Sequence, residues 1–284
     1  MKIINALDKI FDVYINGSFD INRWYKYIEN INPMLKQLCV NDFDEAISTG
    51  LVTFEQDFLP IIYNVFTNEK IREEAIASFG KATRKLAEQV VARFGKTVEV
   101  TIVLYLGLCN GAGWVVNIDN ETYCLLGIEK IMELGWVDVD SMYGLLYHEL
   151  GHVYHSKHGE LERVFDNNKH KFLWQLFVEG VAMVFEQMLI GSYEYFHQDK
   201  DGWKDWCDKN LKRIAKDFYD NLSGMTIENQ RYFGDWVRYN GYADVGYYLG
   251  ARFVQYLCLK CQFDEILSFD VDKVESSYKE FIEV

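Results

Sequence analysis

The chain has 284 residues, of which 49% are hydrophobic and 16% aromatic. This is enough apolar material to bury a large core, so the composition excludes a disordered protein. The formal net charge of −14 argues against nucleic acid as a partner, because binding to phosphate backbones depends on basic surfaces that release counterions.

Two further features bear on the cellular setting. Residues 1–8 carry charges and an amide where a signal peptide needs an unbroken apolar stretch. The longest apolar run, 173–190, is interrupted by Glu179, Glu186 and two glutamines, so we expect no membrane span. The six cysteines are then expected to be reduced thiols, and the protein is expected to be cytoplasmic.

Residues 1–95 show the spacing of helices. Apolar side chains recur there every three or four positions, as at Ile10, Tyr14, Ile28 and Ile31. The stretch 71–94 has the pattern of one amphipathic helix, and Gly95 is placed to end it. We expect this N-terminal helical region to be scaffold.

The periodicity then changes to that of strands. Residues 98–106 are rich in β-branched side chains, and so are 114–118 and 122–126, which the turn-forming pair Asp119 and Asn120 connects. The sequence therefore predicts a small sheet over residues 98–126.

A helix expected over residues 141–156 carries His148-Glu149-Leu150-Gly151-His152. Four residues of α-helix turn through 400°, so the two histidines project from nearly one face, about 6 Å apart along the axis, and can share one metal ion. Glu149 lies one step round the helix and can reach a water at the metal without being a ligand. This is the arrangement of the H-E-x-x-H zinc hydrolases, in which the glutamate is the general base.

A second, strongly apolar helix is expected over residues 171–190, after a polar loop. Glu179 stands at its apolar centre, where a buried carboxylate is costly unless a cation accepts it. We therefore expect Glu179 to be the third metal ligand. Glu186, two turns later on the same face, is a candidate to orient a ligand histidine by binding its other ring nitrogen, without touching the metal itself.

Together, His148–His152 and the segment Val178-Glu179-Gly180-Val181-Ala182 resemble the gluzincins, zinc peptidases with two histidines on one helix and a glutamate on the next. The segment Tyr247-Tyr248-Leu249-Gly250-Ala251 is similar to the Y-x-K-G-A helix start of gluzincin aminopeptidases. The resemblance implies that His148, His152 and Glu179 hold one Zn²⁺ per chain and that Glu149 is the base. It also implies that the Tyr247 hydroxyl stabilises the oxyanion. Leu249 replaces the lysine of that pattern, so recognition of a free substrate amine has no support.

Enzymes of this class commonly place a small sheet above the metal, where its edge strand binds an extended substrate backbone. Gly111, Ala112 and Gly113 are the candidates for that edge, since small residues let another backbone approach closely. An ordinary glycine-rich turn is an equally good interpretation. Tyr248 and Tyr242 are alternatives to Tyr247.

A competing interpretation uses His158 as third ligand, at the spacing found in metzincins. Those enzymes need a helix-ending glycine where this chain has His155, and on an unbroken helix His158 lies about 15 Å along the axis from His148. His155, His158, His170 and His197 are expected to be solvated loop or helix-end residues. A catalytically inactive, metal-holding scaffold that binds peptides is a third possibility.

We therefore expect a predominantly α-helical α+β protein with a zincin-like (gluzincin) fold, in which a small β-sheet lies above the metal-binding helix. The expected regions are an N-terminal helical region, 1–95, and a catalytic region, 96–284, that ends in a C-terminal helical lobe, 199–284. The expected activity is zinc-dependent hydrolysis of a peptide or protein substrate by a metallopeptidase. The sequence indicates neither the substrate nor the oligomeric state.

Overall fold

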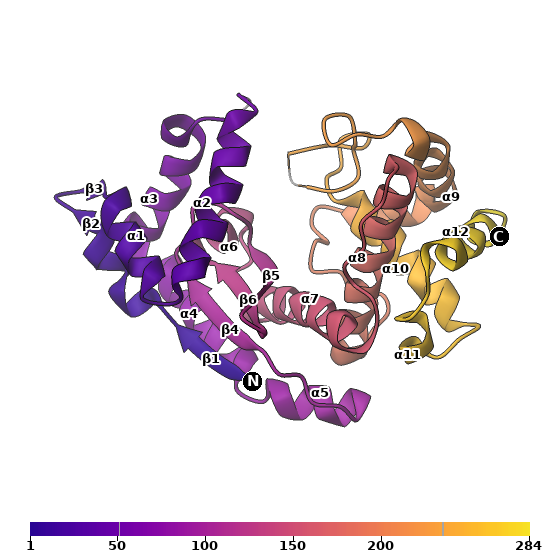
Figure 1. Ribbon diagram of the computed structural model, residues 1–284, viewed down its shortest axis with the longest axis horizontal. Helices are drawn as coiled ribbons and strands as arrows, with labels where there is room; N and C mark the ends of the chain where they lie inside the picture. Colours follow the sequence, from indigo (N-terminus) through magenta and orange to yellow (C-terminus); the bar gives the residue numbers. More distant parts are fainter. Residues whose placement is uncertain (51, 235) are drawn as a thin grey trace. The chain divides into compact units, whose positions relative to one another are not determined.

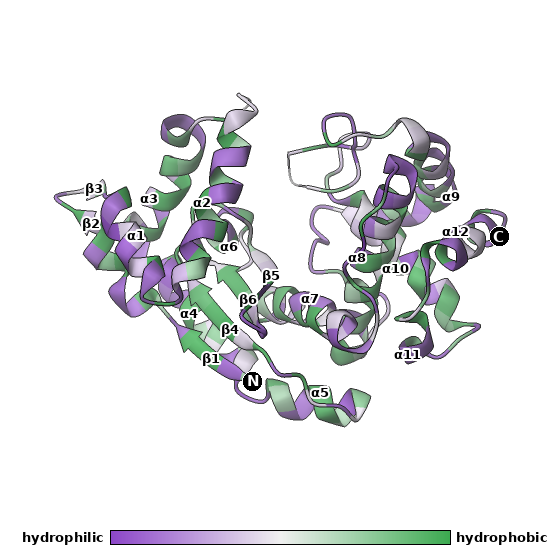
Figure 2. Cartoon of the chain, viewed as in Figure 1, coloured by the Kyte–Doolittle hydropathy of each residue, from purple (hydrophilic) through white to green (hydrophobic). Residues whose placement is uncertain are grey.

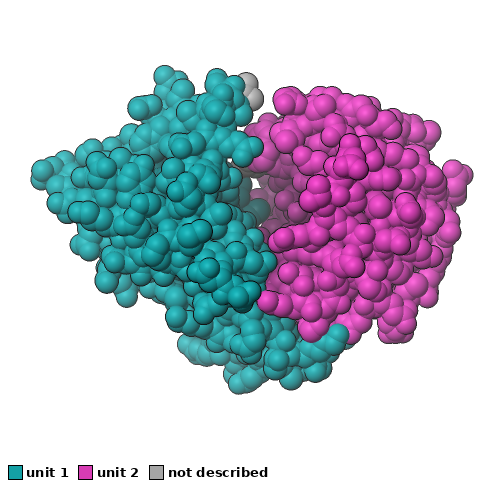
Figure 3. Space-filling model, viewed as in Figure 1, with its two compact units in different colours: residues 1–146 teal, residues 147–284 magenta. Residues whose placement is uncertain are grey.

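The computed structural model describes residues 1–50, 52–234 and 236–284. It has an α+β structure in which helices predominate over a small sheet (Figure 1), so the coarse fold class predicted from the sequence is confirmed. The chain divides into two compact units, Met1–Leu146 and Tyr147–Val284, which Figure 3 shows in teal and magenta. The boundary falls inside helix α7 (Val139–His158), whereas the sequence suggested a division near residue 95.

The sheet of the first unit has four strands in the order β1-β4-β6-β5. The central pair runs parallel, and the hairpin strand β5 lies antiparallel to β6 at one edge. Both turn residues of the hairpin, Asp119 and Asn120, have positive φ, as a two-residue type I′ turn requires. These three strands match the predicted ones: β4 (Thr101–Tyr105), β5 (Gly113–Ile118) and β6 (Glu121–Gly127).

The fourth strand corrects the prediction that residues 1–95 are helical. Strand β1 (Lys2–Asn5) pairs in parallel with β4, so the N-terminal region and the sheet belong to one unit. A short hairpin, β2 (Tyr14–Ile15) with β3 (Ser18–Phe19), is a second departure. Strand β1 has only four residues, most of them exposed, and depends on a partner about 100 positions away. No local pattern reveals such a strand.

Most of the remaining residues of the first unit are in helices. The predicted single helix over 71–94 is wrong, because the backbone leaves the helical conformation at Lys85 and starts again. Neither proline nor glycine stands at that junction to signal it. Gly95 does end the second of the two helices, with φ of 68°. The helical segments are η1 (Leu7–Val13), α1 (Ile21–Glu29), α2 (Pro33–Ser48), η2 (Phe54–Phe58), α3 (Leu59–Thr67), α4 (Glu69–Thr83), α5 (Leu86–Phe94) and α6 (Ile128–Leu134).

Helix α8 (Asn168–Ile190) is the core of the second unit. It packs against α10 and α12, and its middle residues are almost all buried. By length and composition α8 could cross a membrane, but 67% of that stretch is buried inside the unit, which is the position of a core helix. Hydrophobic residues, green in Figure 2, recur along it. The other segments are α9 (Trp203–Asn221), η3 (Leu222–Gly224), α10 (Val245–Cys258), α11 (Phe263–Ile266) and α12 (Val271–Ile282).

Candidate metal centre

Helix α7 presents the two histidines. Its first turn is capped by Asp138, whose carboxylate accepts the backbone N–H groups of Asp140 and Ser141, each at 3.0 Å. The helix is unbroken from Val139 to His158, so it extends two residues beyond the predicted range, 141–156, at both ends. His148 and His152 lie on one face as predicted, with their Nε2 atoms 3.2 Å apart.

Glu179 of α8 completes a group of three. Its Oε2 atom lies 3.1 Å from Nε2 of His148 and 3.3 Å from Nε2 of His152. These three residues form the only His/Cys/Asp/Glu group in residues 1–50, 52–234 and 236–284 whose atoms are close enough to hold a metal ion. The structure therefore brings together the three side chains that the sequence suggested as ligands.

Two glycine contacts allow the helices to approach so closely. A Cβ atom on Gly151 of α7 would lie 2.7 Å from Cα of Ala182 in α8. A Cβ atom on Gly180, the residue after Glu179, would lie 2.3 Å from the carbonyl oxygen of Gly250 in α10. Both distances are far below van der Waals contact, so these positions accept only glycine without a shift of the backbone. Gly151, Gly180 and Gly250 thus set the spacing of the helices that carry the site.

The electrostatic field around His148 favours positive charge. Burial by itself lowers the pKa of His148, but Glu179 and Glu186 outweigh it and raise that pKa well above its usual value. Burial likewise raises the pKa of Glu179, yet His152 and His148 hold it far below its usual range. A field that favours an imidazolium also favours a metal cation in the same place.

Glu149 has a different environment from Glu179. Its side chain is buried, and burial raises the pKa of its carboxyl although His152 and His148 oppose the shift. A carboxylate with a raised pKa takes up a proton more readily than an exposed glutamate does. The pKa values of the two glutamates are therefore shifted in opposite directions.

The structure distinguishes the two neighbouring tyrosines. The ring of Tyr247, in the first turn of α10, lies 5.6 Å from that of His148. The hydroxyl of Tyr248 instead donates to Asp208 at 2.5 Å, and its ring packs on Phe196. Tyr247 is thus the tyrosine that can reach the histidine group. Gly246 leaves room for Phe233, whose ring packs edge-on against Tyr247 at 5.7 Å.

Two histidines expected in solvent are buried instead. Nδ1 of His197 lies 3.0 Å from both carboxylate oxygens of Glu186, and only 3% of its side chain is exposed. His155 is fully buried, with Nε2 at 3.2 Å from the carbonyl oxygen of Leu267. Polar residues near both histidines in the sequence suggested that they are exposed. No spacing in the sequence pointed to Glu186 or to the Leu267 carbonyl group as their partners.

Two other predictions concern residues outside this group of three. Helix α7 continues straight through His155 to His158, so His158 stays about 15 Å along the axis from His148. Gly111, Ala112 and Gly113 belong to the first unit, where Gly113 begins the edge strand β5 and the other two precede it. Their role in binding a substrate stays a prediction.

Comparison with protein-family models, with curated proteins and with solved structures finds no match to this chain. The interpretation of the site therefore depends on its own geometry and chemistry.

Proposed function

We propose that the protein is a zinc-dependent peptidase of the gluzincin type, with His148, His152 and Glu179 as ligands. The observation that supports this most is the spacing of the three donor atoms, 3.1, 3.2 and 3.3 Å. Ligands bound tetrahedrally at about 2.0–2.1 Å lie about 3.3 Å from one another, so one zinc ion fits with little adjustment.

The donor set supports a catalytic site over a structural one. Structural zinc sites use four side chains, usually cysteine or histidine, whereas catalytic sites use three and leave a position for solvent. All six cysteines lie outside the group of three. Zinc in such a site lowers the pKa of water and polarises a carbonyl group.

The chain's own residues supply the other parts of the reaction. Glu149 takes a proton from the attacking water on its carboxylate and passes it to the leaving amine. Its raised pKa makes the first of these transfers, uptake of the proton, easier than for an exposed glutamate. The hydroxyl of Tyr247 donates a hydrogen bond to the substrate oxygen as negative charge develops there.

The experiment that tests this proposal separates metal binding from catalysis. Glu149→Gln removes the base and leaves the three ligands in place, so it should retain zinc and lose peptide hydrolysis, measured on a peptide library. Glu228→Gln is the matched control, because Glu228 is fully exposed. Hydrolysis at the wild-type rate in Glu149→Gln would reject Glu149 as the base. A wild-type chain that binds zinc but hydrolyses no peptide would reject the enzymatic proposal and leave a metal-holding scaffold.

A further inference from the structure

The two ring nitrogens of His148 face opposite ways. Nε2 points at Glu179 and His152, while Nδ1 lies 3.7 Å from Oε2 of Glu186. That distance is within ion-pair range but too long for a hydrogen bond, and Nδ1 of His148 has no hydrogen-bond partner among the described residues. A shift of less than about 1 Å would let Nδ1–H donate to Glu186.

Glu186 itself is fixed by a residue from a separate segment. Its side chain is fully buried in α8, and His197 approaches both of its oxygens from the loop between α8 and α9. A carboxylate can only accept, so Nδ1 of His197 carries the proton and donates it. The imidazole rings of His197 and His148 lie 5.7 Å apart with Glu186 against both.

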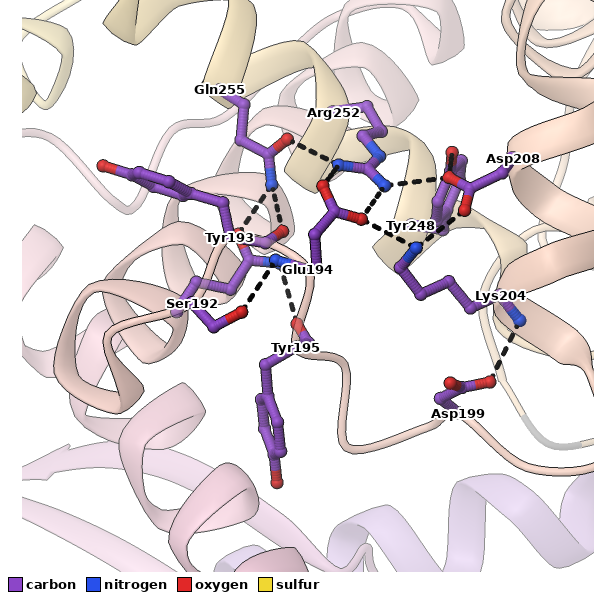
Figure 4. Close-up of polar contacts among 11 residues, drawn as sticks. Ser192, Tyr193, Glu194, Tyr195, Asp199, Lys204, Asp208, Tyr248, Arg252 and Gln255 are labelled. Carbon is purple, nitrogen blue, oxygen red and sulfur yellow. Dashed lines mark hydrogen bonds and ion pairs between the residues drawn. The ribbon is translucent and has the colours of Figure 1, made fainter.

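A polar cluster anchors the loop that carries His197 (Figure 4). Arg252 of α10 binds both carboxylate oxygens of Glu194, at 2.9 and 2.8 Å. Lys204 of α9 binds Glu194 as well, at 2.7 Å, and Arg252 also reaches Asp208. Paired Arg–carboxylate bonds hold a fixed geometry, so the loop is tied to α10 and α9.

We infer that His197 is a positioning residue for the metal centre and acts through Glu186. By donating to Glu186 it fixes the carboxylate toward which Nδ1–H of His148 has to shift by less than about 1 Å to donate, and so directs the Nε2 lone pair of His148 toward the metal. The inference rests on the proposed zinc site. The polar cluster around Arg252 supports it by holding the His197 loop in place.

Two substitutions of His197 separate this role from simple packing. His197→Phe keeps a ring but removes the donor, and zinc affinity, measured by competition with a chelator, should fall about 10- to 100-fold. His197→Asn places an amide N–H close to the position of Nδ1 and should recover most of that loss. The visible spectrum of the Co²⁺-loaded protein should change in His197→Phe and stay near wild type in His197→Asn. His170→Phe, at the start of α8, is a matched control whose affinity should not change.

A double-mutant cycle tests the route through Glu186. In a Glu186→Gln background, His197→Phe should add little further loss, because its effect passes through that carboxylate. The wild-type protein gives an independent test by ¹⁵N NMR, which should find His197 protonated at Nδ1 and, with zinc bound, His148 protonated at Nδ1.

The outcomes distinguish this inference from the proposed function. Zinc binding by wild type with equal affinity in His197→Phe, or a His197 proton on Nε2 alone, would overturn the positioning role and leave the metal centre standing. Failure of the wild-type chain to bind zinc would overturn both.

Discussion

The contact between Gly180 and Gly250 yields a prediction whose sign can be worked out from the structure. A Cβ atom on Gly180 would lie 2.3 Å from the carbonyl oxygen of Gly250 and 2.5 Å from its carbonyl carbon. Both are backbone atoms and cannot rotate aside. Gly180→Ala therefore forces α8 and α10 apart.

The magnitude follows from two opposing terms. Replacing a helical glycine with alanine stabilises an unstrained helix by roughly 0.5–1 kcal/mol. Overpacking a tight contact costs roughly 1–3 kcal/mol, and sometimes more. We expect a net loss of about 1–2 kcal/mol in the free energy of unfolding. Zinc affinity should fall as well, because Glu179 is the preceding residue.

Gly80 provides the matched control. It lies in α4, and a Cβ atom there would have nothing within 4 Å, so Gly80→Ala should stabilise by roughly 0.5–1 kcal/mol. Urea unfolding followed by circular dichroism measures both variants. Should Gly180→Ala prove as stable as Gly80→Ala, with unchanged zinc affinity, the close approach of α8 and α10 is refuted.

Four further substitutions have defined outcomes. Burial raises the pKa of Glu129 to about 7, so between about pH 4.5 and 7 the folded chain keeps a proton that the unfolded chain has released. The wild-type unfolding free energy should lose roughly 3 kcal/mol as pH rises through that window, a slope that urea titrations of Glu129→Gln should not show. Tyr247→Phe should lower kcat roughly 10²- to 10³-fold, whereas Tyr248→Phe should lower the thermal midpoint and leave kcat near wild type. Asp138→Ala removes the cap of α7 and should cost about 1 kcal/mol in urea unfolding, and no loss would mean that the cap contributes nothing.

The features that were predicted well are those set by residues close together in the sequence. His148 and His152 are four positions apart on one helix, so helical geometry alone places them together. The place of Glu179 beside them could be predicted because a carboxylate in an apolar helix needs a compensating cation. The hairpin of β5 and β6 could also be predicted from local sequence, because its two turn residues, Asp119 and Asn120, are adjacent.

What the sequence did not show depends on partners far along the chain. Strand β1 is a strand only because β4 lies beside it. His197 follows a polar turn, and its burial against Glu186 depends on how the loop after α8 folds back. Gly151, Gly180 and Gly250 can be read from the sequence. The contacts between helix backbones that require glycine there appear only in the three-dimensional structure.

The most direct measurement of the central claim is the zinc content and zinc affinity of the wild-type chain beside Glu179→Gln and His158→Ala. We predict about one zinc per wild-type chain, retained in His158→Ala and lost or greatly weakened in Glu179→Gln. Loss of zinc in His158→Ala alone, or a wild-type chain that binds no zinc, would contradict the assignment of His148, His152 and Glu179 as the metal centre.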